Sequence, residues 1–221
     1  LGKSTHTDDK EGDLTFTADQ AVVSKISDDQ IKDELAKFIG DIKQRPSSVS
    51  AIKIDGKTAH ARVRAGESVE IAEREITIYE LITKDIRHTA DAIEVEITVT
   101  CSAGTYIRAI ARDLGDKLKI GGHLISLRRT LVSPFSIEQC QSVKDAELIP
   151  VGEVIEKLFP IRKLELSQSR EISFGRVIEQ NSSEEVFAAI DNLGNFVALL
   201  QNKLQGNLVV AAPILVSGSG Q

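Results

Sequence analysis

Residues 101–129, CSAGTYIRAIARDLGDKLKIGGHLISLRR, join a segment of alternating apolar residues to a run with helical spacing. In the segment before them, AIEVEITVT at 92–100, every second residue from Ile93 onward is Ile or Val, and the residues between are Glu or Thr. This alternation predicts a half-buried β-strand. Gly104 is then expected to end the strand by allowing a sharp turn.

The residues after that turn have the spacing of an amphipathic helix. Apolar side chains recur every three or four positions, Thr105 is the expected N-cap, and Gly121 and Gly122 are expected to end the helix. The pattern therefore places Tyr106 and Arg108 at a strand–helix junction, an edge where chemistry is often located.

The composition is that of a globular chain. Of the 221 residues, 41% are hydrophobic, and no run approaches the roughly 18 apolar residues of a membrane span. No basic-then-apolar signal segment opens the sequence. Cys101 and Cys140 lack the spacing of metal ligands, so we expect reduced thiols in a cytoplasmic protein. His6 and His88 lie in polar segments without a paired ligand, and no metal site is expected.

The net charge of −6 is distributed unevenly along the chain. Residues 1–41, 65–100 and 131–221 carry net charges of −5, −6 and −4, whereas 42–64 carry +5 and 101–130 carry +4. Two basic islands in an acidic chain fit a local phosphate-binding face better than a wholly basic coat. The alternative is ordinary variation in surface charge.

Other segments have clear local signals. Residues 8–12, DDKEG, predict the turn of a hairpin, and a solvated tip is favoured over an RNA-facing loop. Ser27 predicts the N-cap of an acidic amphipathic helix that ends at Gly40. Residues 142–148 and 155–159 predict short helices. Beyond residue 163, apolar runs such as ISFGRVI, EVFAAID, NFVALLQ and LVVAAPILV alternate with turn residues, which predicts a small β domain.

The segment CSAGTYIRAIARDLGDKL…GGHLISLRR resembles the C-(S)-x-G-T-Y-I-R…DLG…G-x-H-L-x-x-L-R-R pattern of the TruB family of tRNA pseudouridine synthases. The opening LGKSTHTDDKEGDL and residues 44–57, QRPSSVSAIKIDGK, are similar to two further family segments. The resemblance implies an isomerase, an intramolecular transferase that converts uridine to pseudouridine at position 55 in the T-loop of tRNA. It implies no cofactor and no metal, the T-stem-loop of tRNA as partner, no membrane, and a monomer at full length.

The resemblance also implies an α+β fold. A pseudouridine synthase catalytic domain with a mixed or antiparallel sheet would be followed by a small β-rich PUA-like domain. We place the catalytic domain, lacking its N-terminal part, at 1–160, and the PUA-like RNA-binding domain at 161–221. In the family this tail grips the acceptor stem.

Three residues take roles in a uracil pocket by resemblance. Tyr106 matches the tyrosine that stacks on the uracil and is proposed to act in removal of the C5 proton; stacking is the simpler role. Arg108 matches the arginine that pairs with the nucleophilic aspartate. Leu127 matches the apolar wall of the pocket, although without the motif it would be interpreted as a core residue.

Basic residues of the two islands are candidate RNA contacts: Lys53, Lys57, His60, Arg62, Arg64, Arg128 and Arg129. Each Lys or Arg would meet a phosphate in a sequence-independent contact. The family usually has Tyr at the position of His60, so a surface histidine remains the alternative there. A structural ion pair is the alternative for Arg128 or Arg129.

The chain contains neither Met nor the G-H-T-G-x-L-D-P segment that carries the family's nucleophilic aspartate. We therefore expect a truncated chain that is inactive alone, in which Arg108 is unpaired unless another acid substitutes. Asp113 is the nearest carboxylate in the helix and is interpreted as a surface or ion-pair residue. Two alternatives stay open: a non-catalytic tRNA-binding or folding module, and a relative of guide-RNA-type rRNA pseudouridine synthases.

Overall fold

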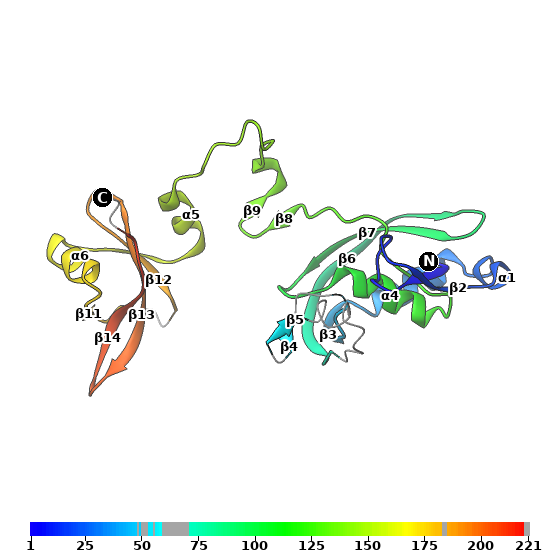
Figure 1. Ribbon diagram of the computed structural model, residues 1–221, viewed down its shortest axis with the longest axis horizontal. Helices are drawn as coiled ribbons and strands as arrows, with labels where there is room; N and C mark the ends of the chain where they lie inside the picture. Colours follow the sequence, from blue (N-terminus) through cyan, green and yellow to red (C-terminus); the bar gives the residue numbers. More distant parts are fainter. Residues whose placement is uncertain (48, 50–52, 55, 59–70, 183–184, 219–221) are drawn as a thin grey trace. The chain divides into compact units, whose positions relative to one another are not determined.

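The computed structural model describes residues 1–221 except 48, 50–52, 55, 59–70, 183–184 and 219–221, and it leaves aside the side chains of Lys53, Ile54, Lys57 and Thr58. The described residues form two compact units, the N-terminal unit Leu1–Leu127 and the C-terminal unit Arg128–Gln221 (Figure 1).

The N-terminal unit is built on an antiparallel sheet with the strand order β3-β6-β7. Two small hairpins, β1-β2 and β4-β5, accompany this sheet. The elements are β1 (Lys3–Thr5), β2 (Leu14–Thr17), α1 (Gln20–Val23), α2 (Asp28–Ala36), β3 (Gly40–Gln44), β4 (Lys53–Ile54), β5 (Lys57–Thr58), β6 (Arg74–His88), β7 (Ile93–Cys101) and α4 (Ile107–Lys117).

The core of this unit lies between the sheet and the helices α2 and α4. Ser27 caps α2 in a capping box with Gln30, as the sequence predicted, although the helix ends at Ala36 rather than at Gly40. Apolar residues of both helices and of β6 and β7 are buried together in one cluster: Ile31, Leu35, Ile76, Ile78, Ile93, Ile110 and Leu114. This packing fixes the first turn of α4 beside the end of the sheet.

The predicted strand and helix of residues 92–122 are confirmed, but both ends of the helix differ. The N-cap is Tyr106, because Thr105 Oγ1 donates instead to the Ser102 carbonyl at 2.9 Å. At the other end, α4 stops at Lys117, and Lys119 takes a left-handed φ of 59° before Gly121 is reached. A left-handed residue ends a helix, so the two glycines serve another purpose.

The C-terminal unit contains a five-stranded sheet in the order β10-β12-β13-β14-β11, antiparallel except for the parallel pair β10-β12. Its buried core includes Phe187, Leu200 and Ile172. The elements are β8 (Leu131–Val132), β9 (Phe135–Ser136), the 3₁₀ helix η1 (Ile137–Gln139), α5 (Val151–Leu158), β10 (Ile161–Lys163), α6 (Leu166–Ser173), β11 (Ile178–Glu179), β12 (Phe187–Ile190), β13 (Phe196–Gln205) and β14 (Leu208–Val216).

Together the two units confirm the α+β fold class. Two local predictions in the C-terminal unit are wrong. Residues 142–148 form turns rather than a helix, and the run ISFGRVI is not one strand, because α6 extends to Ser173 and β11 covers only Ile178–Glu179. Ile172 is fully buried from the helix, so tertiary packing overrides the strand-like composition. The boundary between 160 and 161 stays a prediction.

Candidate active site

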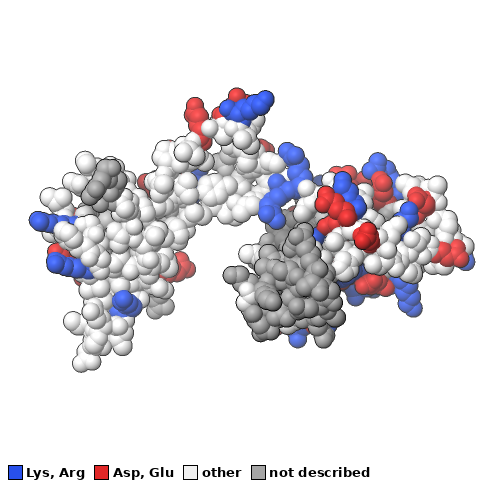
Figure 2. Space-filling model, viewed as in Figure 1, with Lys and Arg blue, Asp and Glu red and all other residues white. Residues whose placement is uncertain are grey.

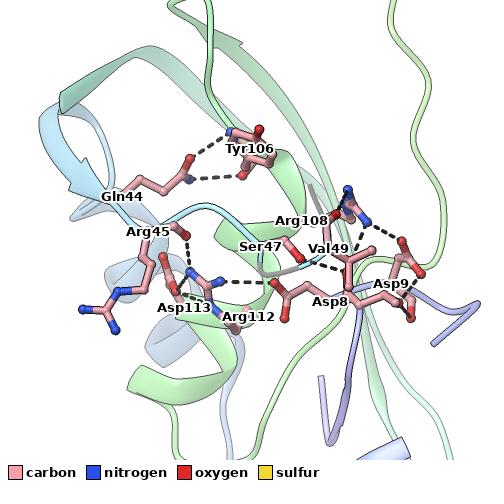
Figure 3. Close-up of polar contacts among 11 residues, drawn as sticks. Asp8, Asp9, Gln44, Arg45, Ser47, Val49, Tyr106, Arg108, Arg112 and Asp113 are labelled. Carbon is pink, nitrogen blue, oxygen red and sulfur yellow. Dashed lines mark hydrogen bonds and ion pairs between the residues drawn. The ribbon is translucent and has the colours of Figure 1, made fainter. Parts of the chain in front are cut away.

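The first turn of α4 presents Arg108 to two other segments of the N-terminal unit (Figure 3). Arg108 Nη1 donates to Asp9 Oδ2 at 2.8 Å and to the Thr7 carbonyl at 3.2 Å. Arg108 Nη2 donates to the Val49 carbonyl at 3.2 Å. Arg108 is therefore paired, and Asp9 is the substituting acid that the sequence left open.

Asp9 is the centre of a small hydrogen-bond network. Its Oδ1 accepts from Thr7 Oγ1 at 2.6 Å and from the Glu11 backbone N–H at 3.1 Å, while its Oδ2 faces Arg108. Burial acts to raise the pKa of Asp9, but the bonds from Thr7, Glu11 and Arg108 together hold that pKa below its ordinary value of 3.8. The carboxylate is therefore ionised at neutral pH and keeps the guanidinium in place.

The hairpin tip that carries Asp9 is only partly solvated, which corrects part of the sequence-based interpretation. Asp8 is only 8% exposed, although Lys10 and Glu11 beside it are exposed. The Lys10 N–H donates to the Leu124 carbonyl and the Leu124 N–H donates to the Asp8 carbonyl, both at 2.9 Å. The tip is thus held between α4 and the segment that leads to Leu127.

Tyr106 is fixed through its backbone by a residue from the sheet (Figure 3). Gln44, the last residue of β3, is 2% exposed. Its Oε1 accepts from the Tyr106 N–H at 2.8 Å, and its Nε2 donates to the Tyr106 carbonyl at 3.1 Å. Gln44 thereby holds both backbone groups of the residue at which α4 begins.

The other predicted site residues lie in several places. Leu127 is 56% exposed, so it is not a core residue. Arg128 and Arg129 are exposed, and neither makes an ion pair with another residue that the structure describes. The remaining candidates, Lys53 and Lys57 by their side chains and His60, Arg62 and Arg64 entirely, lie outside the described residues.

An open hollow of about 630 Å³ lies beside α4, next to Arg45, Arg112 and Asp113. Its lining does not include Tyr106 or Arg108.

The sequence left two interpretations of Asp113, a surface residue or an ion-pair residue. The structure shows the ion pair, with Asp113 Oδ1 at 2.7 Å from Arg112 Nη2. Within the described ranges, no three His, Cys, Asp or Glu residues gather as metal ligands, and no helix there is long and apolar enough to cross a membrane.

The Asp9 network predicts a pH-dependent contribution to stability. Because the folded-state pKa of Asp9 lies below 3.8, the stabilisation is fully present above that pH and is lost as the pH falls through the folded-state value. We expect Asp9→Asn to lower the free energy of unfolding by about 1 kcal/mol at neutral pH. The difference from the parent chain should shrink as the pH falls below 3.8, as measured by urea unfolding at several pH values. A difference that stays constant with pH would contradict this assignment.

Comparisons with known proteins agree with the sequence motif. Residues 1–107 match the model of the TruB family pseudouridylate synthase N-terminal domain, and residues 108–157 match that of the tRNA pseudouridylate synthase B C-terminal domain. The chain is 39% identical over 208 residues to tRNA pseudouridine synthase B of Corynebacterium aurimucosum and 41% identical over 211 residues to that of Rhodococcus jostii. In both cases 92% of this chain is covered.

The fold has a counterpart among solved structures. A chain in the crystal structure of a Cbf5-Nop10-Gar1 complex superposes with a TM-score of 0.61 at 20% identity, over 87% of this chain. This chain spans 62% of that solved chain and 69% and 68% of the Corynebacterium and Rhodococcus relatives. The 20% identity to the chain of the Cbf5-Nop10-Gar1 complex shows a shared fold alone.

Proposed function

The chain belongs to the TruB family of pseudouridylate synthases, and on this premise we propose that the protein isomerises uridine to pseudouridine at position 55 in the T-loop of tRNA. The reaction breaks the C1′–N1 glycosidic bond, turns the detached uracil and rejoins it through C5. The target base lies inside a folded loop, so it must be extruded into a pocket. A carboxylate nucleophile, a stacking group and a route for the C5 proton are then needed.

The observation that carries this proposal is the fixation of Arg108. Its guanidinium is held by two backbone carbonyls and by Asp9, so its direction is set before any substrate arrives. A guanidinium held in this way can orient a second carboxylate and favour the ionised form of that carboxylate. The family places its nucleophilic aspartate beside this arginine. Arg108 would thus orient the nucleophile while Asp9 balances part of its charge.

Tyr106 and Leu127 complete the proposed pocket. The Gln44 clamp fixes the backbone of Tyr106, which limits the directions that its ring can take and suits a stacking role on the uracil. The exposure of Leu127 leaves an apolar side chain available to form a wall of the pocket.

The RNA partner is proposed from charge and from the family. Figure 2 shows Lys and Arg side chains interspersed with Asp and Glu on the N-terminal unit, rather than a continuous basic coat. Contacts at a few positions, with Arg128 and Arg129 among them, are therefore favoured over a broad electrostatic surface. We further propose that residues 161–221 form a PUA-like domain that grips the acceptor stem.

Tritium release from T-stem-loop RNA labelled at C5 of uridine tests this function. The whole protein, purified from its source, is expected to release the label from position 55 and to release none from an RNA in which cytidine replaces that uridine. The 221-residue polypeptide alone is expected to release no tritium, because it lacks the motif that carries the nucleophile. It should still bind tRNA with an affinity that falls as salt rises, with a slope set by its few phosphate contacts.

Each alternative function predicts a different outcome of the tritium-release assay. A non-catalytic tRNA-binding module would bind tRNA but release no label even as the whole protein. A guide-RNA-type enzyme would release label only when a guide RNA is added. Turnover by the 221-residue polypeptide alone would refute the assignment of the nucleophile to a segment outside it.

A further inference from the structure

α4 carries a second arginine, Arg112, one helical turn after Arg108 and on the same face. Arg112 Nη1 donates to Asp8 Oδ2 at 3.1 Å and its Nη2 donates to the Arg45 carbonyl at 2.7 Å. Both arginines therefore bind the same two segments, the hairpin tip at 7–9 and the loop at 45–49 (Figure 3).

Asp8 has the backbone conformation that makes this double attachment possible. Its φ of 59° is left-handed, a conformation that Asp tolerates better than most residues. The turn sends the side chains of Asp8 and Asp9 to arginines that are one helical turn apart. Ser47, which is fully buried, adds a bond from its Oγ to the Thr7 carbonyl at 3.3 Å.

The two ion pairs differ in environment. The side chains of Arg108 and Asp9 are 28% and 26% exposed, whereas those of Arg112 and Asp8 are 21% and 12% exposed. A buried ion pair contributes little net stability compared with apolar packing, because both charges lose their hydration. What such a pair can contribute is a defined geometry, since its hydrogen bonds are directional.

We propose that Arg112 is a positioning residue for Arg108: by binding Asp8 and the Arg45 carbonyl, it fixes the two segments whose carbonyls hold the Arg108 guanidinium. This inference rests on the proposed function in one respect, since Arg108 must act in the reaction for its position to matter. The role extends the site by one turn of α4, to the pair of Arg112 and Asp8.

The test uses Arg112→Gln, Arg112→Lys, Asp8→Asn and the double variant in the whole protein. Misplacement of a catalytic group by about 1 Å reduces rates about 100-fold. We therefore expect Arg112→Gln to lower kcat about 10- to 100-fold with KM changed less than about threefold. Arg112→Lys should restore part of the rate. The double variant should be no slower than Arg112→Gln, because the loss of Arg112 already removes its ion pair with Asp8.

Arg87→Gln is the matched control, because Arg87 also pairs with two carboxylates, Asp85 at 3.3 Å and Glu94 at 3.1 Å, at the far end of β6. It should leave kcat unchanged. Amide hydrogen exchange provides the second readout: in Arg112→Gln, exchange at Lys10 and Leu124 should accelerate about tenfold or more.

The outcomes separate the two proposals. An Arg112→Gln protein with the parent kcat, or one whose rate falls only with its folded fraction, would overturn the positioning role. If the whole parent protein makes no pseudouridine, the proposed function fails. Hydrogen exchange then still decides whether Arg112 fixes the two segments around Arg108: faster exchange at Lys10 and Leu124 supports this fixation, and unchanged exchange overturns it.

Discussion

Arg108→Lys is expected to lower pseudouridine formation by the whole protein about 1,000-fold, with tRNA affinity changed only a few-fold. Lys keeps the positive charge but has no planar fork of donors. It therefore cannot bind Asp9, the Thr7 carbonyl and the Val49 carbonyl together as Arg108 does. A carboxylate nucleophile beside it would lose both its orientation and a fixed counter-charge.

Single-turnover tritium release, alongside filter binding of the same RNA, measures this effect. Arg87→Lys serves as the control, because Arg87 pairs with Asp85 and Glu94 rather than with the residues that hold Arg108. This variant should leave the rate unchanged. Loss of tRNA binding in parallel with the rate would indicate that Arg108 holds RNA instead. An unchanged rate would remove Arg108 from the site altogether.

Local sequence patterns predicted the elements that carry the site but not their boundaries. The alternation in 92–100 and the helical spacing after it correspond to β7 and α4, because both patterns reflect burial against one face. The Gln44 clamp on Tyr106 was missed for a different reason. Gln44 lies 62 residues from Tyr106, and no local rule connects a strand end to a distant helix start.

In the candidate site, too, local patterns predicted single residues but not their distant partners. The motif led to Arg108, but its partner Asp9 lies 99 residues away and belongs to an acidic tip that local rules assign to solvent. The available signal was a doublet of acids, Asp8 and Asp9, in a chain that also has Arg108 and Arg112 at an i, i+4 spacing. Matching these charges would have required knowing that the hairpin folds over α4, which only the tertiary structure provides.

Gly115→Ala is expected to destabilise the N-terminal unit by about 3 kcal/mol or more. Gly115, in the segment DLG of α4, is buried against the chain that returns after the helix. A Cβ at this position would overlap the backbone of Gly121 and Gly122, which cannot move as a flexible side chain can. The Ile120 and Gly121 N–H groups also donate to the Gly115 carbonyl at 3.0 Å. Close approach of two backbones also explains Gly122, because its own Cβ would overlap the Ala111 carbonyl. Gly121 has a left-handed φ of 69°, and its Cβ would meet Lys3, Ser4 and Phe16 instead.

Gly152→Ala is the matched control, because it makes the same substitution within another helix, α5. The nearest atom to a Cβ there would be the Gly194 carbonyl oxygen at 3.9 Å, an ordinary contact. Alanine favours helix, so this variant should gain about 0.5–1 kcal/mol. Urea unfolding of both variants should therefore give shifts of opposite sign. If Gly115→Ala is instead as stable as Gly152→Ala, α4 and residues 121–122 do not approach closely.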